Sequence, residues 1–560
     1  MAGLVHVGAH RKSKHSQKLL RRSKLACRAV DQQPSRPRVA VVGSGWGGIG
    51  AAKALCENEC DVILLDGIPN PASGMTTPSG KPFDAGQRGF WRDYPNMNAI
   101  LAELGLEESD LFTDFTESAF YGPEGLEATA PVFSGSPELP SPLGQVLASF
   151  SRFKRLPLQD RLSITGLLLA MIDFTRDEKT FEAYDRMTAH ELFIRAGLSR
   201  RLVDDFLRPT LLVGLFKPPE ELSAAVTMEL LYFYALAHQT SFDVRWLRKG
   251  SVGETLMRPI VEELKGKNLE VRGGTFVEGL ELSNGRITGL RCKARGTGEA
   301  SELSNLDAVV LALGSGGMRA VLRGSPEVAR RCPTLASAGA LQGIDCISAR
   351  IWLDKFVPTE TPANVLSRFS SLRGAGGTFF MLDQLQPDHQ ALWGGDEPQG
   401  SVVSCDFYNA GALLALSDDE ILRLLLEELL PQAVPEFRMA KAVDSYVQRY
   451  PGAVSWFSPG SYRSRPTLET PIDNLVCAGD WVRMGSREHG AKGLCQERAL
   501  VSGLEAANSL ARRGLLGDNR REHLVIPVRD DEIQVQLGRQ VNRSVSGFLQ
   551  PFGLASPWAR

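Results

Sequence analysis

The sequence has no apolar run of the roughly 18 residues that a helix needs to cross a bilayer. The closest candidate, ITGLLLAMIDF at 164–174, is better interpreted as a buried helix than as one that dips into a membrane. The nine cysteines are scattered singly, and the only close pair, Cys56 and Cys60, has helical spacing. This pattern predicts neither a disulfide framework nor a zinc site.

Other catalytic constellations are missing as well. We find no Ser-His-Asp arrangement, no metal-ligand cluster and no phosphate loop that ends in Gly-Lys-Ser/Thr. We therefore expect no metal centre. The apolar content of 43% excludes general disorder and predicts a globular chain.

Acidic residues are almost missing from residues 1–38, which contain ten Lys or Arg and only Asp31, although the whole chain has a net charge of -2. An Arg-rich, acid-poor leader without a long apolar stretch favours an organelle transit peptide, expected over residues 1–36, over a secretory signal. The alternative is a basic arm that binds nucleic acid or anionic lipid. We expect no nucleic-acid partner.

A glycine cluster stands in RVAVVGSGWGGIGAAKAL, residues 38–55. A buried strand is predicted before it and a helix after it, and the next strand, VILLD at 62–66, ends in Asp66. In such a unit Gly43 permits the turn, Gly45 lets the backbone approach a pyrophosphate, and Gly48 lets the helix pack closely. Asp66 is then placed for a ribose hydroxyl, so the segment predicts a dinucleotide site.

A second segment, LVCAGD at 475–480, repeats the buried-strand pattern and is followed by a helix-forming stretch at 499–510. With VVGSGWGG, CAGDW and QERALVSGLEAA, the sequence resembles the flavin amine oxidase and phytoene desaturase superfamily. The stretches WFSPGS and LETPIDNLVCAGDW are most similar to its carotenoid desaturase branch, which includes the aromatic carotenoid (isorenieratene) synthases and related plastid proteins.

The resemblance implies an α/β, two-dinucleotide-binding-domain flavoprotein. Its Rossmann-like FAD domain is expected to be discontinuous, built from 37–95, 249–319 and 465–512, under a mixed α+β substrate cap. The cap is expected over 96–248 and 320–464, and a tail follows at 513–560. This tail fits either docking onto the body or a surface for a partner.

The pattern and the resemblance together indicate these cofactor-binding residues: Gly43, Gly45, Gly48, Asp66, Gly74, Gly86, Val277, Gly479, Asp480 and Glu497. By resemblance, Val277 offers its backbone to the adenine and Asp480 holds the ribityl chain or the pyrophosphate. Glu497 stands at a helix N-terminus that stabilises charge developing on the flavin. Met75 stands where an arginine often meets the pyrophosphate, and no flavin-linking cysteine is found, so FAD is expected to be held non-covalently.

Candidate catalytic residues are few: His489, Arg88 and Lys492, with His238 less favoured. Hydride abstraction from a polyene needs no protein base, so an acid–base pair is not required. Leu494 and Cys495 occupy the place of the family's aromatic cage residue, which weakens an amine oxidase interpretation.

The function that this resemblance implies is FAD-dependent desaturation, or isomerisation, of a hydrophobic isoprenoid such as a carotenoid. Oxygen or a quinone is the expected electron acceptor, and peripheral membrane association is expected. The plastid is the expected location, with the mitochondrion less favoured. An amine oxidase or protoporphyrinogen oxidase, and a flavin-binding plastid scaffold without turnover, stay open as alternatives.

Overall fold

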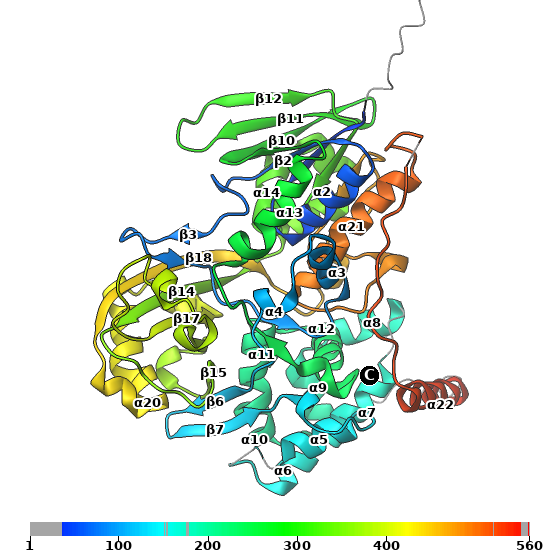
Figure 1. The fold of residues 1–560 in the computed structure, drawn as a ribbon. Coiled ribbons are helices and arrows are strands. Elements are labelled where there is room, and N and C mark those ends of the chain that lie inside the picture. The colour runs from blue at the N-terminus through cyan, green and yellow to red at the C-terminus, as the bar shows by residue number, and fades with distance from the viewer. Residues whose placement is uncertain are drawn as a thin grey trace, which may run out of the picture.

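The computed structural model describes residues 36–150, 152, 155–174, 178–518, 520–549 and 558. The expected transit peptide therefore lies outside the described residues, except for Arg36. One end of the molecule carries a parallel sheet with its helices, and a larger sheet and a helical region lie below it (Figure 1). In the described part of the chain, no helix combines the length and the apolar character that crossing a membrane requires.

The parallel sheet has five strands in the order β19-β13-β1-β2-β9, and every neighbouring pair is parallel. Its strands come from distant parts of the chain: β1 (Arg38–Val42), β2 (Asp61–Leu65), β9 (Leu269–Arg272), β13 (Ala308–Leu311) and β19 (Leu475–Cys477). The central strands are almost entirely apolar because both faces of the sheet are covered. The carboxyl ends of β1, β13 and β19 therefore meet at one edge.

Two helices from opposite ends of the chain pack directly on each other beside this sheet. They are α2 (Trp46–Glu57) and α21 (Gln496–Arg512) (Figure 1). A methyl carbon added at Gly503 of α21 would lie 2.0 Å from the carbonyl oxygen of Gly47, and one added at Gly50 would lie 2.3 Å from that of Leu500. Glycine at these positions lets the two backbones touch.

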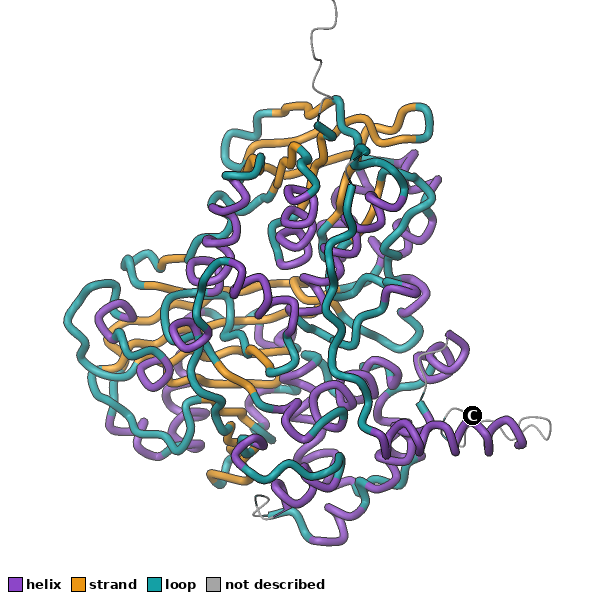
Figure 2. The backbone as a smooth tube through the Cα atoms, turned by 45° about the vertical axis from the view of Figure 1, so that its right-hand side comes forward, coloured by secondary structure: helices purple, strands orange, loops and turns teal. Residues whose placement is uncertain are grey.

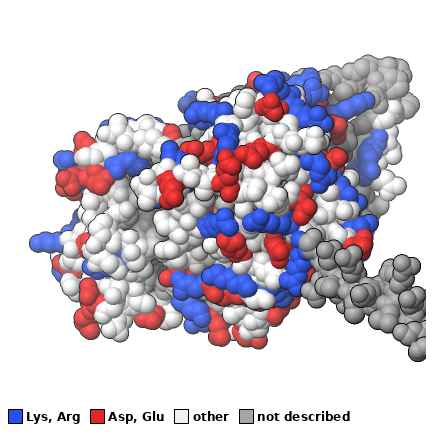
Figure 3. Space-filling view, turned by 90° about the horizontal axis from the view of Figure 1, so that it is seen from above, with Lys and Arg blue, Asp and Glu red and all other residues white. Residues whose placement is uncertain are grey.

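A three-stranded antiparallel sheet, β10 (Thr275–Ser283), β11 (Arg286–Ala294) and β12 (Ala300–Ser304), closes this end of the molecule. Seen from above, the described part of this face has Lys, Arg, Asp and Glu side chains interspersed, without a continuous field of one sign (Figure 3). The remaining helices here are α13 (Arg258–Lys265), α14 (Ser315–Arg323), α15 (Pro326–Arg331) and α16 (Pro333–Ala340).

The larger sheet has the order β18-β14-β17-β16-β15-β6-β7, and only the pair β15 and β6 is parallel. Its strands are β6 (Ser118–Gly122), β7 (Gly125–Ala130), β14 (Gly343–Leu353), β15 (Ala363–Leu366), β16 (Gly376–Met381), β17 (Val402–Tyr408) and β18 (Ala442–Ser455). One face is covered by α19 (Asp418–Arg423), the π-helical η9 (Leu424–Leu429) and α20 (Leu430–Ala433). Two short ribbons, β3 (Met75–Thr76) with β4 (Pro82–Phe83) and β5 (Phe90–Trp91) with β8 (Val244–Arg245), connect the two halves.

A helical region lies at the end of the molecule that is remote from the parallel sheet (Figure 2). It contains α4 (Glu108–Leu111), α5 (Leu143–Phe150), α6 (Leu158–Leu162), α7 (Thr165–Asp173), α8 (Glu178–Asp185), α9 (Ala189–Arg195), α10 (Arg200–Leu202), α11 (Arg208–Gly214) and α12 (Ala224–Leu231), whereas α3 (Pro95–Glu103) lies beside α21. The apolar stretch at 164–174 forms α7, which buries Leu167, Ala170 and Met171 but exposes Leu169. It is thus a helix with one buried face.

The C-terminal tail lies on the body of the protein. After α21, an extended stretch that we name the strap, residues 520–532, runs along the molecule to α22 (Ile533–Leu549). The strap begins beside α2, where His523 Nδ1 lies 2.7 Å from Glu57 Oε2. It ends beside the helical region, where the hydroxyl of Tyr232 donates to Asp531 at 2.5 Å.

Candidate functional site

The glycine loop after β1 is shaped by two glycines that admit no side chain. Gly43 has φ of +106°, and a methyl carbon added there would lie 2.2 Å from the carbonyl oxygen of Ala312. A methyl carbon at Gly48 would lie 1.8 Å from the carbonyl oxygen of Gly43. Both residues therefore define the loop itself.

Gly45 differs from these two. It is the N-cap of α2, and no atom of the described residues lies within 4 Å of a methyl carbon added there. No side chain of the described residues caps α2, so N–H groups of its first turn are free to bind an anion at the positive end of the helix dipole. The open space above Gly45 therefore fits a phosphate group.

Asp66 lies directly beside this loop, at the end of β2. Its Oδ2 accepts hydrogen bonds from the backbone N–H and the hydroxyl of Ser44, both at 2.7 Å, and Oδ1 accepts from Ile68 N–H at 2.7 Å. The carboxylate thus fixes the loop, while its role toward a ribose stays a prediction.

Val277 is brought to the same end of β2. The backbone N–H of Thr275 donates to the carbonyl of Asp66 at 2.7 Å, and Val277 follows in β10 with its side chain buried. Next to it, the exposed ring of Phe276 covers Gly67, where a methyl carbon would lie 2.3 Å from the ring. The sequence pattern did not single out Phe276.

The segments on both sides of the β3–β4 ribbon are held by other parts of the chain. A methyl carbon at Gly74 would lie 2.5 Å from the carboxyl carbon of Glu254, so this part packs closely on the turn before α13. Gly86 has φ of +80°, and the N–H of Gln87 donates to Asp406 Oδ2 at 3.1 Å. Met75 is exposed and brings no charge to the site.

Asp406 of β17 is a residue that sequence reasoning missed. Its Oδ1 accepts from the hydroxyl of Ser348 at 2.7 Å, and burial raises its pKa. The exposed guanidinium of Arg88 acts electrostatically on Asp406 and on the phenols of Tyr408 and Tyr450. The larger sheet therefore fixes the Gly86–Arg88 turn. Asp406 is remote from this turn in the sequence and reaches it only because the larger sheet forms.

Gly479 and Asp480 lie in the turn that follows strand β19, next to α2. A methyl carbon at Gly47 would lie 3.1 Å from the backbone nitrogen of Gly479, whose N–H donates to the hydroxyl of Ser502 at 2.7 Å. Burial raises the pKa of Asp480 to about 6 despite the nearby charge of Arg498. The two glycine-bearing turns that the sequence predicts thus lie side by side.

The N-terminus of α21 makes contacts in two directions. The indole of Trp46 donates to Gln496 Oε1 at 2.9 Å, and Gln496 Nε2 donates to the carbonyl of Gly89 at 3.1 Å. The fully buried Glu497 accepts from the N–H groups of Asn96 and Met97, at 2.8 and 3.0 Å, and so caps α3. Burial raises its pKa to about 6. Any contact of Glu497 with the cofactor stays a prediction.

Lys492, a candidate catalytic residue, is buried in a chain of ion pairs. Its Nζ lies 3.0 Å from carboxylate oxygens of both Glu229 and Glu488. Glu488 also binds Arg498 at 2.7 Å, and Arg498 together with Lys492 holds the pKa of Glu488 well below its usual range. These contacts link α12 to α21, and none of them supports proton transfer by Lys492.

The two histidines that the sequence suggested also have structural contacts. His489 Nε2 lies 2.9 Å from the carbonyl of Ile526, and its Nδ1 accepts from Ala491 N–H at 3.3 Å. Burial lowers its pKa to about 4, so the ring is neutral at pH 7 and donates through Nε2. His238 Nδ1 lies 3.3 Å from Glu532 Oε1.

Cys495, the N-cap of α21, meets two phenols from distant parts of the chain, of which sequence reasoning missed Tyr94. Tyr94 and Tyr234 are fully buried with their hydroxyl oxygens 3.4 Å apart, and both are hydrogen-bonding partners of the Cys495 thiol. Burial raises the pKa of both phenols, so they are neutral at pH 7. The ring of Trp91 packs against that of Tyr234 in a tilted arrangement, with the ring centroids 4.4 Å apart. This wall is aromatic and uncharged.

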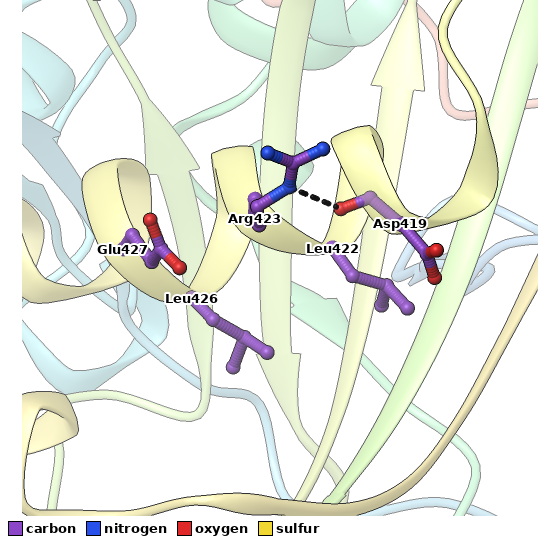
Figure 4. Close-up of a pocket in the computed structure, with 5 residues that line it drawn as sticks. All are labelled: Asp419, Leu422, Arg423, Leu426 and Glu427. Carbon is purple, nitrogen blue, oxygen red and sulfur yellow. Dashed lines mark hydrogen bonds between the residues drawn. The ribbon is translucent and has the colours of Figure 1, made fainter.

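A surface hollow of about 420 Å³ lies elsewhere, on the helices that cover the larger sheet (Figure 4). It is lined by Asp419, Leu422, Arg423, Leu426 and Glu427, and the Arg423 guanidinium bonds to the carbonyl of Asp419 at 3.4 Å. None of the expected site residues lines it.

Comparisons with known proteins agree with this arrangement. A family model described as flavin containing amine oxidoreductase matches residues 47–511. The 15-cis-phytoene desaturase, chloroplastic/chromoplastic, of Solanum lycopersicum is 23% identical over 462 residues, which cover 80% of this chain and 75% of that protein. The carotenoid phi-ring synthase of Streptomyces griseus is 27% identical over 498 residues, covering 85% and 88%.

Among solved structures, cyclohexylamine oxidase from Brevibacterium oxydans is similar with a TM-score of 0.58 at 14% identity, over 85% of this chain and 99% of that chain. At this identity the likeness shows the fold alone. The predicted α/β flavoprotein fold, the family resemblance and FAD as cofactor are confirmed. The chain belongs to the flavin-containing amine oxidoreductase family and is an FAD-dependent oxidoreductase.

Proposed function

We propose that this protein desaturates or isomerises a hydrophobic isoprenoid such as a carotenoid, at a membrane surface in the plastid. The names of its relatives support this substrate class, because they include phytoene desaturases, zeta-carotene desaturases and carotenoid phi-ring synthases. The names of the plant relatives among them carry the word chloroplastic, which supports the plastid over the mitochondrion.

The observation that carries the cofactor site is the open space above Gly45 at the uncapped N-terminus of α2, next to the Gly479 turn. We expect the pyrophosphate to lie there, the ribityl chain near Asp480, and the adenosine end near Asp66 and Val277. The first turn of α21 would then hold the flavin ring against the Gly86–Arg88 turn. Bound FAD supplies a hydride acceptor, or reduced flavin for an isomerisation.

The residues around the expected ring position favour an apolar substrate. Tyr94, Tyr234 and Trp91 form an uncharged aromatic wall against which an apolar polyene can pack, although aromatic faces also attract cations. Burial of this wall also excludes water from the reacting centre. Arg88 is the charged side chain next to the expected ring position. Its guanidinium suits an anion or a quinone oxygen better than an ammonium group.

The alternatives have less support. An amine oxidase or a protoporphyrinogen oxidase shares the fold, but the curated relatives described above act by name on carotenoids. A flavin-binding scaffold without turnover would share the cofactor site, but the family model and the names of the relatives are those of enzymes. We propose non-covalent FAD, with oxygen or a quinone as the electron acceptor for net desaturation.

An anaerobic flavin-bleaching assay tests this function. Residues 36–560 are purified with FAD in mild detergent and mixed with a carotenoid extract, simple amines or protoporphyrinogen in parallel. Loss of flavin absorbance with the carotenoid extract alone is the expected result. Bleaching by amines or protoporphyrinogen would contradict the substrate class. If the flavin stays oxidised with every substrate, isomer analysis after chemical reduction separates isomerisation from a non-catalytic role.

A further inference from the structure

The C-terminal helix α22 carries an apolar stripe that faces away from the protein. Ile533, Leu537, Val541 and Val545 are spaced by four residues and are 75%, 55%, 62% and 50% exposed. Four apolar residues at this spacing form one face of the helix. A stripe of this kind on a soluble surface marks an interaction site.

The opposite side of α22 is fixed to the body. A methyl carbon at Gly538 would lie 3.5 Å from the side chain of Ile172 in α7, and Asn542 Nδ2 donates to Asp173 Oδ1 at 2.9 Å. Arg539 forms an ion pair with Asp531, whose carboxylate also accepts from Tyr232. The helix is therefore held with its apolar stripe outward.

The strap sets where α22 begins. Just before the helix, Glu532 accepts from the N–H of Ser141 at 2.9 Å and lies 3.3 Å from His238. Gln534 donates to the carbonyl of Ser141 at 3.0 Å, which places the start of α22 beside the start of α5. The family match ends at residue 511, so the strap and α22 lie beyond the part of the chain that the family shares.

Further exposed apolar side chains lie on α5, α6 and α7, at the same end of the molecule as α22 and remote from the parallel sheet (Figure 1). They are Leu143, Val146 and Leu147 of α5, Leu158 and Leu162 of α6, and Leu169 of α7. The apolar surface is thus spread over four helices, α22 and the shorter α5, α6 and α7. This arrangement suits a fluid, extended partner.

The charge on α22 points to a lipid surface. Its 17 residues include no Asp or Glu; Arg539 is paired with Asp531, and the exposed Arg543 is the other positive charge of the helix. An amphipathic helix with apolar residues on one side and only positive charge on the other binds the interface of anionic membranes.

We infer that the outward stripe of α22, together with the exposed leucines of α5–α7, binds the surface of a lipid bilayer containing anionic lipid. This inference rests on the proposed function, because an isoprenoid substrate is dissolved in lipid, and it deepens it by naming the docking surface. The cap then faces the membrane, and the nucleotide-binding end lies away from it (Figure 1).

Vesicle flotation tests the surface with the full chain and bound FAD. The vesicles contain phosphatidylcholine alone or phosphatidylcholine with phosphatidylglycerol. Leu537→Glu places a charge in the stripe, and Gln536→Glu places the same charge on an exposed position of the same helix outside it. We expect Leu537→Glu to lower vesicle binding about tenfold or more relative to Gln536→Glu, with binding of the wild type strongest to the anionic vesicles.

Several outcomes overturn the inference: equal loss of binding in both variants, no binding of the wild type to either vesicle, or a wild-type dimer that Leu537→Glu dissociates in sedimentation. The last result would make a second copy the occupant of the stripe. Flavin absorbance and the melting temperature show whether each variant is folded. The detergent bleaching assay separates this inference from the proposed function, since bleaching without vesicle binding contradicts only the surface, and vesicle binding without bleaching contradicts only the chemistry.

Discussion

The carboxylate of Glu497, at the start of α21, accepts hydrogen bonds from both the backbone and the side-chain amide of Asn96, each at 2.8 Å. The side-chain oxygen Oδ1 of Asn96 accepts from the backbone N–H of Ile526 at 2.7 Å, and its Nδ2 also donates to the carbonyl of Ile526 at 2.8 Å. The buried Asn96 thus connects three elements: α3, the strap, and the helix α21 that is expected to face the flavin. Without the strap, the side chain of Asn96 would no longer be held in position to donate to the carboxylate of Glu497.

Glu497 should make stability depend on pH. Its folded-state pKa of about 6 lies above the usual 4.5, so the folded protein binds this proton more tightly than the unfolded chain does. The contribution is therefore favourable at low pH and decreases as pH rises from about 4.5 to 6, by about 2 kcal/mol in total. Urea unfolding of the wild type and Glu497→Gln between pH 4.5 and 7 measures it.

In this comparison the free energy of unfolding of the wild type, relative to Glu497→Gln, should fall across the interval. Glu505→Gln on the same helix controls for the change of charge, because its carboxylate lies 3.6 Å from Arg512. A constant difference between wild type and Glu497→Gln at all these pH values would contradict the raised pKa.

Two glycine variants should separate cofactor binding from folding. Gly45→Ala adds a methyl group where the described residues leave open space, so it should leave the melting temperature of the apoprotein unchanged and lower FAD affinity about tenfold or more. Gly48→Ala meets the carbonyl of Gly43 at 1.8 Å and should destabilise the apoprotein by about 3 kcal/mol or more. Calorimetry and flavin titration measure both effects.

Gly135→Ala is the matched control, since it also places a methyl group in open space but lies outside the glycine loop. FAD affinity unchanged in Gly45→Ala would remove the pyrophosphate from this position.

Lys492 should matter for stability. Lys492→Met leaves the carboxylates of Glu229 and Glu488 without this partner in a buried place, which should destabilise the protein by about 3 kcal/mol. The double variant Glu229→Gln/Lys492→Met should recover part of this loss, because one of the unpaired charges is gone. Denaturant unfolding measures the cycle.

For comparison, Lys265→Met breaks an exposed pair with Glu262 and should change stability by about 0.5 kcal/mol or less. A folded, stable Lys492→Met variant with a large loss of turnover would instead support the catalytic role suggested by the sequence.

His489→Leu should loosen the strap and leave the chemistry intact. The variant loses the donor to the carbonyl of Ile526 and the acceptor for Ala491 N–H, so limited proteolysis should cut faster within residues 520–532. The rate of flavin reduction should stay close to that of the wild type. A fall of about a hundredfold or more with an unchanged cleavage pattern would show general acid–base catalysis by His489.

The parts of the fold that the sequence predicted are those set by local patterns. The strand before the glycine cluster, the helix after it and the strand that ends before Asp66 are present as β1, α2 and β2. The helix-forming stretch at 499–510 lies within α21. Buried strands with continuous apolar residues and glycine at fixed spacing are readable because each residue acts on its immediate neighbours.

The partners of the site residues could not be predicted in the same way. Asp406 reaches the Gly86–Arg88 turn across 319 positions, and Glu497 reaches Asn96 across 401. Glu497 and Lys492 were proposed from their place near the expected flavin, yet their side chains bind protein groups from other elements. Such contacts depend on how distant elements pack, which no local pattern in this chain records.

The contact between α2 and α21 also has a consequence for the order of folding. The hydrogen bond from Trp46 to Gln496 spans 450 positions, and β19 joins the edge of the parallel sheet from the same late segment. During synthesis, almost the whole chain must therefore be made before α21 can pack beside the first glycine loop. We expect nascent chains to hold an unfinished sheet edge, and cofactor loading to begin only once translation has passed α21.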